Sequence, residues 1–339
     1  MIRSFFCKNA LSLMLPKRRR LVKKEARVRR WTTAIKTAKI SNMKLWDMIG
    51  DAPAAALLGM CKNAGKTTAL NRLIREWQAA EGPGLALTSI GRDGESTDLV
   101  TGTDKPPIYL YRGMLAATAK GLLARCDVSR EILAATGLFT SLGEVIIFRA
   151  QSDGFVQLAG PAIVEHMKQL GEQLRDLGAK RILLDGALSR LSPLGGIPGG
   201  VCLLSTGASL DRDMDKVIRE TAHVARLLNL KREEAVEESE TMNLPGAFTE
   251  RQATELIRSS ALKRIRQIRV RDSSCLLLKR ESFEALTGRG IVFSVDKPAR
   301  LGGITVNPVS AGGWRFEAGA FLEKMQEAVP VPVMDVEKE

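Results

Sequence analysis

A Gly-Lys-Thr triplet stands between a short apolar run and a stretch with helical periodicity. The residues from Leu57 to Leu70 are LLGMCKNAGKTTAL, so Gly65 and Lys66 open the helical stretch. Successive backbone N–H groups and the start of a helix carry partial positive charge, which suits the β- and γ-phosphates of a nucleoside triphosphate. The segment from Met60 to Thr68 is therefore predicted to bind ATP or GTP.

Each side chain in this segment has an expected role. Lys66 would neutralise the β- and γ-phosphate oxygens, and Thr67 would offer its hydroxyl to Mg²⁺. Lys62 is either a second phosphate contact or a solvated loop lysine. The residues expected to contact the nucleotide are Asn63, Ala64, Gly65, Lys66, Thr67 and Thr68.

The loop departs from the usual phosphate-loop spacing. G-x-x-x-x-G-K-[ST] requires glycine at position 60, but Met60 stands there and Gly59 comes one residue early. The alternative interpretation is that these glycines only form a tight turn between a strand and a helix. The apolar strand before the loop and the helix after it favour the phosphate-binding interpretation.

A nucleotide site of this kind also needs a carboxylate near Mg²⁺. Asp185 follows the apolar run Arg181 to Leu184 and precedes Gly186, so it stands at the end of a predicted strand. Because ligands of parallel sheets gather beyond the carboxyl ends of the strands, Asp185 is expected to lie near Thr67 and help hold the metal. An aspartate that only caps a turn is the alternative.

Two other strand-end loops carry candidate groups. In the first, Asp93 or Glu95 could hold Mg²⁺ or orient a water molecule, and Arg92 could meet phosphate. An Asp-Gly turn with a local ion pair explains the same residues equally well. The second loop, from Ser205 to Ser209, is rich in hydroxyls and could contact an anion.

The elements that must position these groups indicate an α/β fold. Apolar runs that end at glycine or a polar turn alternate with helix-length segments, which is typical of a parallel sheet. We expect a P-loop NTPase-like, mainly parallel sheet flanked by helices, with a smaller C-terminal α/β region. The expected strands are 54–58, 85–90, 108–111, 144–150, 155–159, 181–184, 201–204, 275–278, 291–295 and 304–306, and the expected helices are 66–80, 113–135, 161–177, 213–229 and 316–328.

Composition suggests four ranges along the chain. A basic arm at 1–42 would be disordered or belong to a start codon set too early, with Met43 the true start. A nucleotide-binding domain would follow at 43–230, a charged helical segment at 231–272 and the C-terminal α/β region at 273–339. The tail from Pro330 to Asp335 could pair as an edge strand, since proline tolerates only edges.

Charge and cysteine usage narrow the function classes. The net charge is +13, but residues 1–42 hold thirteen of the 51 Lys and Arg against one acid, Glu25. The rest of the chain is almost neutral, so no specific nucleic-acid surface is expected. The five cysteines are widely separated, which favours the cytoplasm. No apolar stretch has the roughly 18 to 20 residues needed to span a bilayer.

The histidines and Cys61 give weaker indications of catalytic chemistry. His166 and His223 lie in helical patterns without a Ser, Cys or second His at useful spacing, which argues against triad or zinc chemistry. Cys61 is a small filler of the loop, or a thiolate whose pKa is depressed by the nearby helix start.

The ordered set of motifs resembles one family, the P-loop reactivase subunits for lysine 5,6-aminomutase, an enzyme that uses adenosylcobalamin and pyridoxal phosphate. The resemblance covers most of residues 45–335. It implies an accessory NTPase that, with a partner ATPase, frees an aminomutase of damaged cobalamin. The motifs that carry it are Gly59 to Thr68, Ser89 to Glu95, Leu184 to Ala187 with Arg190, Ser205 to Ala208, and Ile304 to Pro308.

Three functions remain open on the sequence. The leading hypothesis is this accessory NTPase, with Lys66, Asp185, Asp93 and Glu95 as its catalytic candidates. The second is a small-molecule kinase or ligase in which Arg92, Asp93 and Glu95 hold an acceptor. The third is a nucleotide-binding scaffold without catalysis.

Overall fold

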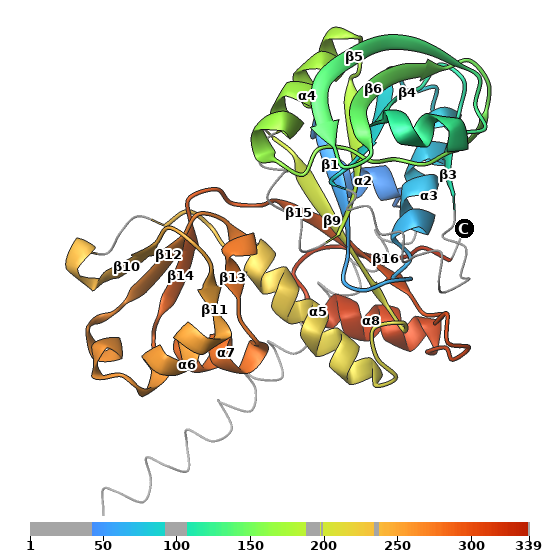
Figure 1. Cartoon of the computed structure of the whole chain (residues 1–339). Helices are drawn as coiled ribbons and strands as arrows, with labels where there is room; N and C mark the ends of the chain where they lie inside the picture. Colours follow the sequence, from blue (N-terminus) through green and yellow to red (C-terminus); the bar gives the residue numbers. More distant parts are fainter. Residues whose placement is uncertain (1–42, 92–106, 188–196, 198, 234–236, 338–339) are drawn as a thin grey trace, which may run out of the picture. The chain divides into compact units, whose positions relative to one another are not determined.

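The computed structural model describes residues 43–91, 107–187, 197, 199–233 and 237–337. Residues Leu45–Glu339 form one compact unit. Its largest element is a nine-stranded sheet in the order β16-β15-β9-β1-β8-β2-β4-β6-β5 (Figure 1). The strands are β1 (Ala54–Gly59), β2 (Leu85–Ser89), β4 (Leu115–Ala119), β5 (Arg130–Thr140), β6 (Gly143–Ala150), β8 (Arg181–Ala187), β9 (Val201–Gly207), β15 (Leu301–Asn307) and β16 (Val333–Asp335).

The sheet is mostly parallel. Each neighbouring pair from β16 to β4 runs parallel, and only the pairs β4–β6 and β6–β5 are antiparallel. All residues of β2, β4 and β9 are buried. Such continuous apolar strands are expected where helices cover both faces of a parallel sheet. The structure thus confirms the α/β class with a large, mostly parallel sheet flanked by helices.

Two groups of helices cover this sheet. Helices α4 (Val164–Asp176), α5 (Met214–Leu228) and α8 (Ala318–Ala328) share one apolar core with Ala56 and Leu58 of β1. The alternate β1 residues Ala55 and Leu57 are buried as well, and α3 (Lys66–Ala79) contacts β1, β8 and β9. A short helix, α2 (Leu45–Ile49), packs on α3. Because strand side chains alternate between faces, α2 and α3 cover the face opposite α4.

The prediction of a helix at 113–135 is wrong. The chain there forms β4, the 3₁₀ helix η2 (Lys120–Arg125) and most of β5, which pairs with β6 across a hairpin. The alanines and leucines of this stretch favour helix locally, but pairing with β6 supplies long-range contacts that local propensity does not include. Strand β3 (Ile108–Leu110) pairs separately with β7 (Gly154–Val156).

The interpretation of 231–272 as a charged helical segment is also wrong. This range contains β10 (Thr241–Leu244) and β12 (Gln267–Val270), which form a parallel three-stranded sheet with β14 (Val292–Val295). Exposed charges mask the sequence pattern of these short strands. In β12, Ile268 and Val270 are buried, whereas Arg269 between them forms an ion pair with Asp296. The other elements here are β11 (Phe248–Thr249), β13 (Leu276–Leu277), α6 (Glu250–Arg258), α7 (Arg280–Thr287), η5 (Glu238–Glu240), η6 (Ser260–Arg264) and η7 (Ser273–Cys275).

The smaller sheet has its own apolar core, which includes Phe248, Phe283 and Phe293. The expected C-terminal region at 273–339 is divided between the two sheets, because β14 joins the small sheet whereas β15 and β16 join the large one. The expected edge strand in the tail is confirmed, since β16 pairs only with β15. No helix in the described ranges is long and apolar enough to cross a membrane.

Candidate functional site

The loop between β1 and α3 is held by two residues in the left-handed region. Asn63 has φ +60° and Gly65 has φ +83°. Gly65 is the residue before the first turn of α3, and no side chain caps the helix there. The first N–H groups of α3 are therefore left for another acceptor, as a phosphate site at a helix start requires.

The displaced glycine has a structural reason. The Met60 backbone N–H donates to the Ser205 carbonyl oxygen at 3.0 Å, which continues the pairing of β1 with β9 one residue beyond Gly59. The Met60 side chain packs towards the core, where the Thr221 hydroxyl approaches its sulfur at 3.2 Å. At Gly59 a Cβ would lie 3.3 Å from the Cys61 carbonyl oxygen, so the tight approach occurs one residue earlier than in the usual spacing.

Lys66 and Asp185 meet at the centre of this edge of the sheet. The Lys66 ammonium donates a short hydrogen bond to Asp185 Oδ1, and the two side chains are 17% and 12% exposed. Strand β8 lies directly beside β1 with Asp185 opposite Leu57, so the aspartate is two residues from the carboxyl end of its strand. The pair brings a cation from the helix start and an anion from the neighbouring strand to one point.

The remaining loop residues lie around this pair. Thr67 is 9% exposed and Ala64 is buried, whereas Asn63 is exposed and Thr68 half-buried. Thr67 and Asp185 supply two oxygen donors on neighbouring elements. No cluster of three or more His, Cys, Asp or Glu side chains suited to a metal occurs in the part of the chain that the structure describes.

Hydroxyls from the adjacent strands are used internally. The Ser205 and Thr305 hydroxyls are 2.8 Å apart, and the Thr206 and Thr221 hydroxyls are 2.9 Å apart, all of them buried. Ser89 donates to the Asp185 carbonyl oxygen at 3.0 Å. Ser205 and Thr206 therefore do not present their side chains for the anion contact considered for this loop.

Four candidate residues lie outside the described residues. Arg92, Asp93 and Glu95 follow β2 in the sequence, and Arg190 follows β8. His223 is buried, and its Nε2 atom forms a hydrogen bond of 3.0 Å with the Leu278 carbonyl oxygen, so this nitrogen is engaged inside the protein.

Cys61 does not have the features of an activated thiol. Burial raises the pKa of the Cys61 thiol above its ordinary value, so less thiolate is present at neutral pH. Of the two interpretations offered by the sequence, the structure favours the small filler.

The carboxyl ends of β15 and β16 contribute contacts that the sequence did not reveal. A Cβ on Gly65 would lie 3.0 Å from Asn307 Cβ and 3.1 Å from Val336 Cγ2, so the segment from Met60 to Thr68 packs against residues more than 240 positions away. Asn307 was notable only as part of the motif at 304–308. Its place beside Gly65 depends on β15 joining the sheet next to β9, which is a long-range pairing.

Comparison with known proteins gave no match: neither a family model, nor a curated protein, nor a solved structure is similar to this chain. The site is therefore interpreted from its own geometry.

Proposed function

We propose that this chain binds a nucleoside triphosphate, ATP or GTP, with Mg²⁺ at the loop from Met60 to Thr68. The observation that carries the proposal is the meeting of Lys66 and Asp185 at an uncapped helix start, near the carboxyl ends of adjacent parallel strands. This is where ligands of parallel sheets bind, and a cation on the first turn of a helix suits phosphate. On this proposal the large sheet is a P-loop NTPase fold.

The ion pair gives the site a specific chemistry. Lys66 would exchange its partner from Asp185 to the β- and γ-phosphate oxygens, so its charge remains compensated in both states. Asp185 would then need a new cation, because a partly buried carboxylate without a partner is costly. A metal ion that arrives with the nucleotide supplies that cation.

The donor set fits Mg²⁺. This ion prefers oxygen ligands and is commonly held by one or two carboxylates together with phosphate oxygens, rather than by an all-protein cage. Thr67 and Asp185 would hold it here, and it would supply charge stabilisation at the phosphates.

We further propose that the nucleotide drives an accessory function for an adenosylcobalamin-dependent aminomutase, with a partner ATPase, in the cytoplasm. Support comes from the order of the motifs that resemble the reactivase subunits. The described parts of these motifs all lie at the carboxyl ends of neighbouring strands of one sheet, at Gly59, Ser89, Asp185, Ser205 and Asn307. The four described cysteines are free thiols, as expected in a reducing compartment.

The accessory function is tested by phosphate release with and without a candidate aminomutase. We expect slow basal hydrolysis that rises when the aminomutase is added, and no rise for Lys66→Ala. A rate that stays flat on addition of the aminomutase contradicts the accessory role, even if the nucleotide binds. Product formation from a small-molecule acceptor without any protein partner would favour a kinase or ligase instead.

A further inference from the structure

A shallow concavity lies on the same edge of the large sheet, in the loops that follow β9 and β15. Its volume is about 360 Å³, and it is lined by Arg212, Gly312, Gly313, Trp314, Arg315 and Phe316. This volume falls within the range of small-molecule sites. None of these residues belongs to the phosphate loop or to the pair of Lys66 and Asp185.

The two loops that form the concavity are joined rigidly to each other. Trp314 donates from its indole nitrogen to the Ala208 carbonyl oxygen at 3.0 Å, and the Ala311 N–H donates to the Ser209 hydroxyl at 3.3 Å. An isolated antiparallel bridge between Val309 and Arg315 closes the second loop on itself. The concavity is therefore built by tertiary contacts and is not a gap between loose loops.

Arg212 is oriented by an aromatic ring. Its guanidinium lies 4.8 Å from the centre of the Trp314 ring, a distance at which a cation is attracted to the ring face. The other contacts of Trp314 hold this ring in place, since a Cβ on Gly312 would lie 2.0 Å from the ring. The indole therefore serves as a platform for the guanidinium and leaves the nitrogens of Arg212 for a ligand.

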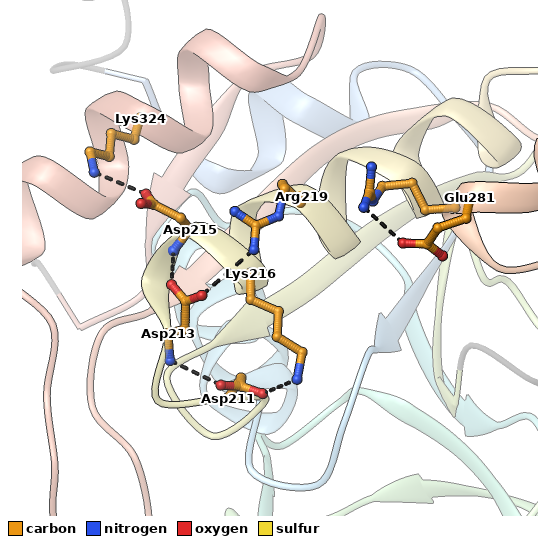
Figure 2. A network of polar contacts seen from close by, with 8 residues as sticks. Asp211, Asp213, Asp215, Lys216, Arg219, Glu281 and Lys324 are labelled. Carbon is orange, nitrogen blue, oxygen red and sulfur yellow. Dashed lines mark hydrogen bonds and ion pairs between the residues drawn. The ribbon is translucent and has the colours of Figure 1, made fainter. Parts of the chain in front are cut away.

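The charge of the concavity is positive. Arg212 and Arg315 are exposed, and neither has a carboxylate partner among the described residues. Three nearby acids are engaged in ion pairs, as Figure 2 shows: Asp211 pairs with Lys216, Asp213 with Arg219 and Asp215 with Lys324. A fourth, Glu317, accepts from the Gly319 and Ala320 N–H groups at the start of α8. Two uncompensated guanidiniums on one concave surface favour an anion, because their planar donors match carboxylate and phosphate oxygens.

Asn307 links the strands that carry these loops to the segment from Met60 to Thr68. A Cβ on Gly65 would lie 3.0 Å from Asn307 Cβ, and the Asn307 carbonyl oxygen accepts from the Ala208 N–H at 2.9 Å. We propose that this concavity binds a small molecule with two or more oxyanion groups, carboxylate or phosphate, at a site separate from the triphosphate. Arg212 and Arg315 each take one oxyanion group.

Tryptophan fluorescence tests this proposal on the full chain. Citrate and inorganic phosphate are titrated separately at constant ionic strength, with chloride as the balancing anion. We expect a saturable change that disappears in Trp314→Phe, because the other two tryptophans that the structure describes, Trp46 and Trp77, contact each other elsewhere. Arg212→Ala and Arg315→Ala should each weaken the response at least tenfold, whereas Arg251→Ala, an exposed arginine on α6, should leave it unchanged.

Lys66→Ala separates this site from the proposed nucleotide site. The citrate response should persist in Lys66→Ala, whatever happens to nucleotide binding in that variant. If Lys66→Ala abolishes the response, the anion binds at the phosphate loop and the proposal is wrong. It is also overturned if the fluorescence of Arg212→Ala responds like that of the parent, or if neither citrate nor phosphate changes the fluorescence more than chloride does. Binding of a glutamate-rich peptide in that second case would point to an acidic protein segment as the ligand.

Discussion

Lys66 and Asp185 are each partly buried, and each compensates the charge of the other. Two such side chains can lie this close to the apolar core only as a pair, since an unpaired charge there loses its hydration without a replacement. The pair therefore contributes to folding as well as to the proposed ligand exchange.

Asp185→Asn should lower the free energy of unfolding by about 1.5–3 kcal/mol, the usual contribution of a hydrogen bond to a charged group. Urea unfolding at low ionic strength measures this loss. Asp211→Asn is the matched control, because Asp211 also pairs with a lysine but that lysine is 54% exposed. A loss no larger than that of the control would show that the partly buried pair adds nothing to stability.

The Cys61 thiol should react slowly with iodoacetamide at neutral pH. Burial raises the pKa of Cys61 above the ordinary thiol value of 9.0, so the thiolate fraction, and with it the alkylation rate, should still be rising above pH 9. Peptide mapping by mass spectrometry follows Cys61 separately from the other cysteines. A rate that reaches its plateau below pH 8 would instead indicate an activated thiolate.

At the scale of elements, the turn from β1 into α3 depends on Gly65. Its positive φ disfavours any L side chain, and Asn307 and Val336 leave little room for a methyl group. These two constraints act on the same residue, and they can be separated by comparison with another glycine.

Gly65→Ala should destabilise the chain more than Gly178→Ala does. Gly178 has φ +99° and nothing within 4 Å of a Cβ, so it reports the backbone strain alone, roughly 1–2 kcal/mol. Gly65→Ala should cost this amount plus the displacement of Asn307, and it should also weaken nucleotide binding. Equal losses in denaturant unfolding for the two variants would mean that the loop relaxes away from Asn307.

The elements that the sequence predicted well are those whose burial is visible locally. β1, β2, β8 and β9 are short apolar runs that end at glycine or a polar turn, and α3, α4 and α5 have clear helical periodicity. β4 and β5 were not predicted, because an alanine-rich segment does not indicate which strand it will pair with. β10 and β12 were not predicted, because exposed charges flank their buried residues.

Part of the candidate site was open to prediction for a related reason. Lys66 and Asp185 both follow apolar strands, and strands of a parallel sheet end on the same edge, so their meeting follows from topology. The contact of Gly65 with Asn307, and the concavity around Arg212 and Trp314, depend on β15 lying beside β9. No local sequence pattern predicts the pairing of β15 with β9, which are almost 100 residues apart.

At the scale of the whole molecule, a ligand that binds only the folded chain stabilises all of it. Nucleotide with Mg²⁺ at a hundred times its dissociation constant should add about 2.7 kcal/mol. For a chain of this size each kcal/mol raises Tm by roughly 2–4 °C, so a rise of about 5–10 °C is expected. Differential scanning fluorimetry measures it, and a Tm that does not change with Mg²⁺-nucleotide contradicts the proposed binding.

The central claim is that Lys66 binds the phosphates of a nucleoside triphosphate. Its most direct test is a calorimetric titration in which Mg²⁺-ATP or Mg²⁺-GTP is added to the parent chain, to Lys66→Ala and to Lys180→Ala. Lys180 is an exposed lysine at the opposite, amino-terminal end of β8, so its substitution removes the same charge far from the loop. The account predicts saturable binding by the parent and Lys180→Ala, and about ten- to hundredfold weaker binding by Lys66→Ala, as expected for loss of a charge-assisted hydrogen bond. Equal affinity of Lys66→Ala and the parent would contradict it.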